Sequence, residues 1–125
     1  MISQEIPKHI IDKCRKKLLK TKYDLLNQVR EAQNDMRFSE GHGGDEADQT
    51  VRLMEEKEFL NRNERINYQL MEVEMALARI EQGCYGICQE TGELIEPERL
   101  MALPWTSLSI EGAEIRESMN KKYAR

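Results

Sequence analysis

The sequence has few aromatic residues, few turn-forming residues and no long apolar run. Aromatic side chains make up 6% of its 125 residues, and there are only 7 glycines and 3 prolines. This scarcity argues against a β-sandwich or barrel, which needs frequent turns. No apolar run approaches the roughly 18 residues of a membrane span, and the first residues lack the basic and apolar regions of a secretory signal. We therefore expect a cytoplasmic protein that does not bind membranes.

Cysteine is also scarce. Three cysteines, an odd number, favour a reducing compartment over a disulfide framework. Cys84 and Cys88 have a spacing that zinc ligands use, but no Cys or His follows them. The other candidate ligands lie on distant segments and are His9, Cys14 and His42. The residues therefore predict no structural zinc, and they favour buried, inert thiols over redox-active ones.

The chain is acidic overall, but its charge is unevenly spread. Its formal net charge is -4 and its pI is about 5.3. A protein that binds a DNA duplex through phosphates is normally basic, so we expect no sequence-specific DNA binding. Residues 8–22 carry seven basic side chains against Asp12 alone, whereas residues 45–64 are mainly acidic. The two regions are either solvated helix faces or one basic and one acidic docking surface.

Two long segments have the apolar spacing of helices. In the first, Ile11, Leu18, Leu25 and Ala32 recur every seven residues, which predicts a helix from about Pro7 to Phe38. Three glycines within residues 41–44 then end the helix and allow the chain to reverse. In the second segment, predicted over residues 45–82, the apolar residues with heptad spacing are Phe59, Ile66, Leu70, Val73, Leu77 and Ile80.

A helix of that length cannot bury its apolar stripe in a small globule. At 1.5 Å per residue it spans about 57 Å, so it needs a partner of similar length. The first helix precedes it through a short turn, which predicts an antiparallel coiled-coil hairpin with its tip at residues 39–48 and a monomeric protein. Asp45 and Asp48 lie on one face of that tip. The pattern alone leaves helix capping and a functional role open for these carboxylates.

After Gly83 the chain changes character, so we divide it into residues 1–82 and a small module over residues 83–125. The segment around Gly92 predicts a tight turn between two short extended pieces. Residues 111–125 predict a short terminal helix. The side chains expected in the core of the module are those of Tyr85, Ile87 and Trp105.

This module resembles a known family. The family pattern reads G-x-Y-G-x-C-x-x-C-G, then I-x-x-x-R-L-x-A, a proline and a second C-x-x-C pair. The residues that carry the resemblance are Gly83, Cys84, Tyr85, Gly86, Ile87, Cys88, Thr91, Gly92, Ile95, Arg99, Leu100, Ala102 and Pro104. They are similar to the zinc-finger module of the DksA/TraR transcription factors. The four zinc-ligand positions of that family fall here on Cys88, Thr91, Ser109 and Gly112, which implies a zinc-independent member.

The resemblance implies a mainly α fold. It consists of a long antiparallel coiled-coil hairpin, a small C-terminal zinc-finger-like module that lacks zinc, and a short terminal helix. The family carries D-x-x-D-x-A at the hairpin tip, and this chain has Asp45 and Asp48 there, with Thr50 in place of the alanine.

The resemblance also implies a function. Such proteins enter the secondary channel of bacterial RNA polymerase and modulate initiation, often jointly with the stringent-response nucleotide ppGpp. Asp45 and Asp48 would be the effectors, while Arg65 and Arg99 resemble basic positions that contact polymerase or nucleotide. Glu72 replaces another expected basic position, which argues against a direct ppGpp site on this chain.

Two other classes of function compete with this interpretation. A Gre-type transcript-cleavage factor shares the hairpin and an acidic tip that holds a catalytic Mg²⁺, but its C-terminal domain has a different signature. A structural coiled-coil module without a polymerase partner is the other alternative. No nucleophile–base pair or cofactor-binding loop is visible, so we do not expect an enzyme.

Overall fold

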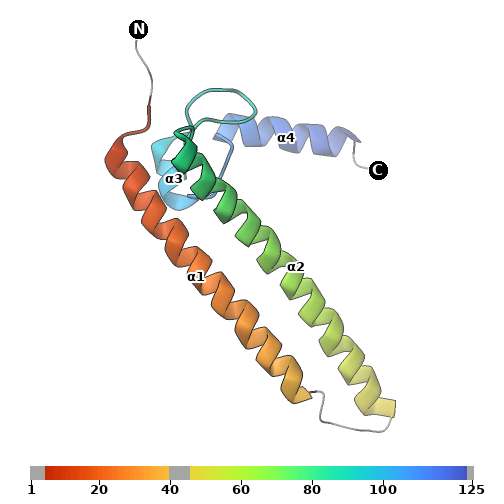
Figure 1. Cartoon of the computed structure of the whole chain (residues 1–125). Coiled ribbons are helices and arrows are strands. Elements are labelled where there is room, and N and C mark those ends of the chain that lie inside the picture. The colour runs from red at the N-terminus through yellow and green to blue at the C-terminus, as the bar shows by residue number, and fades with distance from the viewer. Residues whose placement is uncertain (1–4, 40–45, 124–125) are drawn as a thin grey trace. The chain divides into compact units, whose positions relative to one another are not determined.

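The computed structural model describes residues 5–39 and 46–123. Its elements, labelled in Figure 1, are α1 (Lys8–Ser39), α2 (Glu46–Gln82), α3 (Pro97–Ala102) and α4 (Ile110–Tyr123). Within the described residues there is no strand, and the turn around Gly92 is closed by a single antiparallel bridge between Ile87 and Leu94. The mainly α class is therefore confirmed. No helix in this part of the chain is long and apolar enough to cross a membrane.

The chain forms two compact units. Unit 1 combines Met1–Lys20 with Glu72–Arg125, and unit 2 is Thr21–Met71. Each long helix contributes one segment to each unit. The sequence-based division into residues 1–82 and 83–125 remains a proposal about domains.

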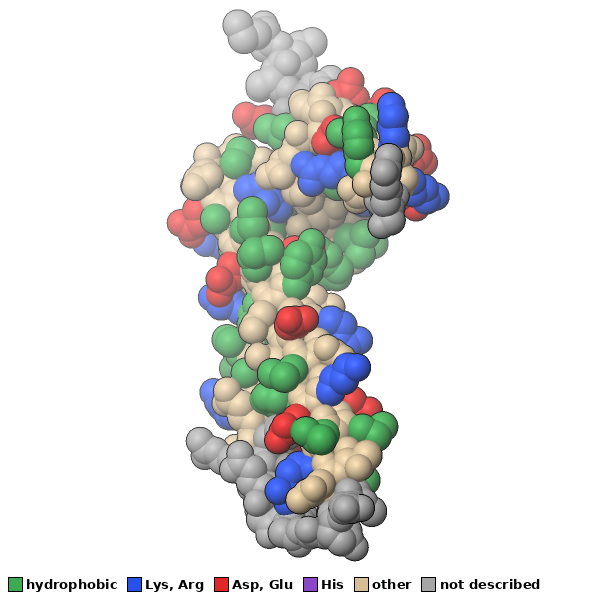
Figure 2. Space-filling view, turned by 90° about the vertical axis from the view of Figure 1, so that its right-hand side faces the viewer, with side chains coloured by type: hydrophobic (Ala, Val, Ile, Leu, Met, Phe, Trp, Pro, Cys, Tyr) green, Lys and Arg blue, Asp and Glu red, His purple; other side chains and the backbone are tan. Residues whose placement is uncertain are grey.

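Unit 2 is a pair of antiparallel helical segments (Figure 1). Its buried apolar side chains are Leu25 and Ala32 of α1 and Ile66 of α2, and all three belong to the predicted stripes. α2 also exposes many large apolar side chains. Those in unit 2 are Val51, Leu53, Met54, Leu60, Tyr68 and Met71. Figure 2 shows apolar side chains scattered among charged ones on the face turned toward the viewer. α2 is thus less one-sided than its heptad spacing suggests.

Unit 1 buries side chains from both long helices and from the module. The core residues are Cys14 and Leu18 of α1, Val73 and Ala76 of α2, and Tyr85, Cys88, Ile95 and Leu100 of the C-terminal part. Ile6 joins them and packs against Gly86, where an added Cβ would overlap the Ile6 side chain. Gly86 also has a φ of 89°, a backbone conformation that favours glycine. Ile6, just before α1, is therefore part of this core.

The short helix α3 was not predicted, although Pro97 in its first turn is a typical start signal. The last carbonyls of a helix lack intrahelical partners, and here side chains from other elements supply donors to α3 and the turn that follows it. Cys14 Sγ donates to the Leu100 carbonyl (3.5 Å), Lys17 Nζ to Met101 (2.8 Å), Tyr85 Oη to Pro104 (2.7 Å) and Arg79 to Trp105 (3.3 Å). α3 is thus held in place by α1, α2 and Tyr85.

The expectation that Ile87 lies in the core is wrong. Its side chain is 42% exposed, while its neighbours Gly86 and Cys88 are buried. The chain is extended at its bridge to Leu94, so successive side chains point to opposite sides. Tyr85 is buried as predicted, and Trp105 is partly buried.

We predict that Leu18→Ala destabilises the protein by about 2–5 kcal/mol, because Leu18 is fully buried and its truncation leaves a cavity. Leu19→Ala is the matched control, since the Leu19 side chain is 50% exposed, and it should change stability by no more than about 0.5 kcal/mol. Urea unfolding measures both. Equal losses for the two variants would contradict the described packing of α1.

Candidate functional site

The four positions that resemble zinc ligands lie together in unit 1, around the Cys88 sulfur. Ser109 Oγ donates a hydrogen bond to Cys88 Sγ (3.4 Å), and the Thr91 N–H points to the same sulfur (3.5 Å). Gly112 approaches so closely that an added Cβ would overlap Cys88 Sγ. Cys88 itself is 1% exposed. The sulfur therefore fills the centre of the cluster.

Ser109 is also the residue directly before α4. Its Oγ accepts a hydrogen bond from the Gly112 N–H (3.0 Å), which is the usual geometry of a helix N-cap. The Glu96 carboxylate accepts from the Ile110 N–H (3.2 Å), so two side chains satisfy the first amides of the helix. The Ser109 hydroxyl thus accepts from α4 while it donates to Cys88.

These contacts favour the ionised form of Cys88. Burial alone would raise the pKa of the thiol, but hydrogen bonds from Ser109 and Thr91 outweigh it and lower the pKa to about 6. The start of α4 adds partial positive charge beside the sulfur. At neutral pH the side chain is therefore mainly a thiolate, which the sequence did not indicate.

The cluster does not fit a structural zinc ion. Such a site takes four side-chain ligands, usually Cys or His. Here Cys88 supplies one sulfur and Ser109 one hydroxyl, whereas Thr91 contributes its backbone N–H and Gly112 has no side chain. The Cys84 sulfur instead lies 3.9 Å from Gln82 Oε1. Among the residues that the structure describes, no three His, Cys, Asp or Glu side chains lie close enough to hold a metal ion.

The predicted acidic tip is described in part. Asp48 lies in the first turn of α2 with an exposed side chain. Asp45 and His42 lie outside the described residues. An exposed carboxylate near a helix N-terminus interacts favourably with the helix dipole, and it is also accessible to a partner.

The predicted basic positions lie in different surroundings. Arg99 is partly buried, and its Nε donates to the Leu108 carbonyl (2.8 Å), so it stabilises the chain between α3 and α4. Glu72 interacts electrostatically with Arg79, whose burial lowers its pKa while Glu72 acts in the opposite direction. Arg79 donates to the Trp105 carbonyl (3.3 Å).

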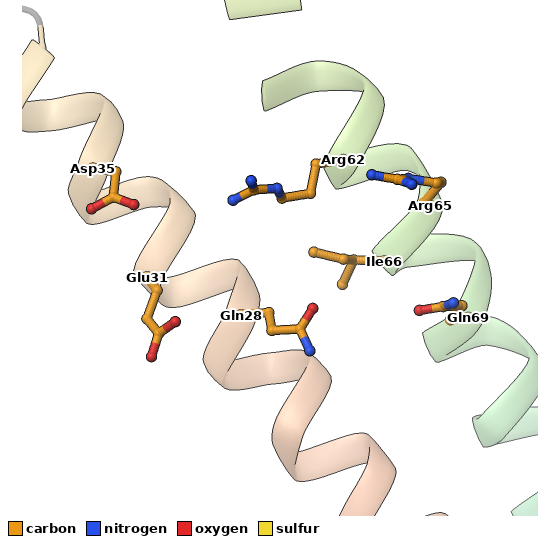
Figure 3. Close-up of a pocket in the computed structure, with 7 residues that line it drawn as sticks. All are labelled: Gln28, Glu31, Asp35, Arg62, Arg65, Ile66 and Gln69. Atoms are coloured by element: carbon orange, nitrogen blue, oxygen red, sulfur yellow. The ribbon is translucent and has the colours of Figure 1, made fainter. Parts of the chain in front are cut away.

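Arg65 lines a groove inside unit 2, shown in Figure 3. The same groove contains Arg62 on α2, and Glu31 and Asp35 on α1. These three residues were not among the predicted site residues. The spacing of Arg62 and Arg65 indicated a shared helix face, but the acidic wall opposite depends on how α1 and α2 are aligned.

We predict that Ser109→Ala raises the pKa of Cys88 and costs about 1–2 kcal/mol of stability, because it removes a thiolate hydrogen bond and a helix cap. Thiolate absorbance measured against pH, with Cys88→Ala as the control, reports the pKa. In the parent, the folded pKa of about 6 lies below the ordinary value of 9.0. The thiolate contribution to stability is therefore complete above about pH 9 and is lost as the pH falls toward 6. An unchanged pKa in Ser109→Ala would contradict the assigned hydrogen bond.

Comparisons with known proteins agree on one family. Residues 83–118 match the family described as prokaryotic dksA/traR C4-type zinc finger. The chain is 32% identical over 103 residues to the RNA polymerase-binding transcription factor DksA of Caulobacter vibrioides, covering 82% of this chain and 72% of that one. It is 30% identical to an uncharacterized protein of Aquifex aeolicus, covering 93% and 82%.

A solved structure shows the same relationship in three dimensions. Transcription factor DksA2 from Pseudomonas aeruginosa matches with a TM-score of 0.81 and 33% identity, over 90% of this chain and 87% of that one. Each of these three similarities covers more than four fifths of this chain. The chain therefore belongs to the DksA/TraR family.

Proposed function

We propose that the protein is a non-enzymatic regulator that binds bacterial RNA polymerase in the cytoplasm and modulates transcription initiation from the secondary channel. The observation that carries this proposal is the similarity to an RNA polymerase-binding transcription factor over 82% of the chain. The match to DksA2 supports it independently at the level of the fold. We expect the protein to act as a monomer, because Leu25 and Ala32 of α1 and Ile66 of α2 are buried within a single chain.

The acidic tip is the proposed effector. Asp45 and Asp48 would meet the polymerase near its catalytic centre and change the relative stability of two states of the promoter complex. A difference of about 1.4 kcal/mol between those states shifts their ratio tenfold. Two carboxylates are therefore sufficient to regulate initiation without contributing much to binding.

Binding itself would depend on other surfaces. Arg65 is exposed on α2 and suits a polymerase contact. Arg99 Nε donates a hydrogen bond to the Leu108 carbonyl. Its remaining guanidinium N–H groups are the proposed contacts to polymerase or nucleotide. We place ppGpp as a joint effector at the polymerase, since Glu72 stands where the family resemblance led us to expect a basic residue.

We further propose that the module needs no zinc. The Cys88 sulfur is held by Ser109, Thr91 and the first turn of α4, and its close approach to Gly112 leaves no space for a side chain at position 112. The hydrogen bonds of Ser109 and Thr91 to Cys88 would then take the place of the links that a metal makes between the turn and the terminal helix.

We predict that the purified protein contains less than about 0.1 zinc per chain and that a strong chelator does not change its thermal unfolding, because folding and metal binding are uncoupled when the ligands are absent. Metal analysis and thermal unfolding with and without chelator measure this. One zinc per chain, or unfolding by the chelator, would contradict zinc independence.

We predict that Asp45→Asn and Asp48→Asn abolish regulation but leave polymerase binding within about twofold. The substitution removes charge and retains size and some capping ability, so the loss of a dipole interaction costs only about 0.3–1 kcal/mol of stability. Open-complex lifetime on a ribosomal RNA promoter and competition with DksA for polymerase measure the two properties. Asp24→Asn, at an exposed position of α1, is the matched control.

Two results would count against the tip assignment. If both variants shorten the open-complex lifetime as well as the parent does, the tip carboxylates are not the effectors. If binding falls in proportion to activity, docking and effect are not separate. Cleavage of the transcript in backtracked complexes would instead favour a Gre-type activity.

A further inference from the structure

The groove in unit 2 has two walls of opposite charge. It encloses about 340 Å³ between α1 and α2. Its lining residues are Gln28, Glu31 and Asp35 on α1, and Arg62, Arg65, Ile66 and Gln69 on α2. In Figure 3, Arg62 extends from α2 toward α1, and Ile66 points into the space below it. Ile66 is 3% exposed, so the side chains that a partner can reach in the groove are polar or charged.

No ion pair joins the acidic wall on α1 to the basic wall on α2 among the described residues. Within the described part of the chain, neither Arg62 nor Arg65 forms a hydrogen bond or an ion pair, and the same holds for Glu31 and Asp35. All four side chains are exposed. Two guanidinium groups and two carboxylates therefore line one groove without a protein partner among the described residues.

The spacing within each wall is regular. Arg62 and Arg65 are three residues apart, and Glu31 and Asp35 are four apart, so each pair spans about one helical turn along its own helix. Because α1 and α2 run side by side, the groove presents a strip of positive charge parallel to a strip of negative charge. Gln28 and Gln69 add amide donors and acceptors to the two walls.

This charge arrangement selects among ligands. A polyphosphate would pair with the arginines but would face the carboxylates of α1, and a polycation would meet the opposite conflict. A segment with an acidic flank and a basic flank satisfies both walls, and the planar arginine side chains suit two-point contact with carboxylates. The volume fits a few side chains that enter from such a segment, not the segment as a whole.

We propose that this groove binds a mixed-charge segment of RNA polymerase, with acidic side chains directed to Arg62 and Arg65 and basic side chains directed to Glu31 and Asp35. The inference rests on the proposed function and adds the α1 wall and the chemistry of the partner to it. The groove thereby fixes the direction in which the hairpin lies against that segment, because a reversed pairing places like charges together.

Two double variants test the proposal. Arg62→Glu/Arg65→Glu and Glu31→Arg/Asp35→Arg should each weaken polymerase binding by about tenfold, because each converts two attractive contacts into repulsive ones. Asp12→Arg/Asp24→Arg is the matched control on exposed positions of α1 outside the groove, and it should bind within about twofold of the parent. Fluorescence anisotropy with polymerase holoenzyme measures the affinity, and circular dichroism checks that each variant is folded.

The possible outcomes separate this inference from the proposed function. If the parent binds and the α1-wall variant binds equally well, the groove assignment is wrong while polymerase binding stands. If the parent does not bind polymerase, both are wrong. Binding of ppGpp to the isolated protein that is lost in the arginine variant would identify a nucleotide site and overturn the mixed-charge partner.

A photo-crosslinker introduced at Gln28 identifies the segment directly. We expect the crosslinked polymerase peptide to carry acidic and basic residues within one or two helical turns of each other. A peptide with charge of one sign would overturn the proposal. Crosslinking from Leu19, an exposed position outside the groove, provides the background.

Discussion

The close contact between the Cys88 sulfur and the first turn of α4 is the constraint on which the C-terminal part of the protein depends. It requires glycine at position 112, because any side chain there would overlap the sulfur. The Ser109 hydroxyl takes part in it twice, because it caps α4 and also donates a hydrogen bond to Cys88. The ion pair between Arg116 and Glu90 (3.1 Å) holds the next turn of the helix to the same loop. A metal site distributes such links over four ligands, whereas here they converge on one thiolate.

The second set of constraints acts on α3 and the turn that follows it. A six-residue helix is too short to be stable alone. Its last carbonyl groups have no partner within the helix, and burying them without donors would cost free energy. Those donors are the side chains of Cys14 and Lys17 on α1, Arg79 on α2, and Tyr85. The acceptors are backbone carbonyl oxygens, so these hydrogen bonds depend more on the position of the backbone than on the identity of the α3 side chains. This explains how the module keeps its form with a small core.

The sequence was sufficient to predict the helical elements and insufficient to predict their contacts. The seven-residue recurrence through Leu18 and Leu25 and the glycine at position 83 located α1 and α2 to within one or two residues. Ile87 was wrongly assigned to the core, because its apolar character said nothing about the side to which an extended chain directs it. The resemblance indicated which residues occupy the four ligand positions, but the lowered pKa of Cys88 depends on hydrogen bonds that only the folded structure shows. The groove was missed for a similar reason, since the acidic residues of α1 and the arginines of α2 line one groove only once the two helices are aligned.

The composition of unit 1 has a consequence for the order of folding during synthesis. The first segment of unit 1 ends at Lys20 and leaves the ribosome about fifty residues before its second segment, because Thr21–Met71 lies between them. Unit 2 is continuous and can pair as soon as its second helix has emerged, whereas the Cys14 and Leu18 side chains have no complete core until Leu100 is made. Newly synthesised chains therefore expose an apolar strip at their N-terminal end for most of translation. A chain that stops before α3 lacks Leu100, so the Cys14 and Leu18 side chains lack part of the core that buries them in the folded protein.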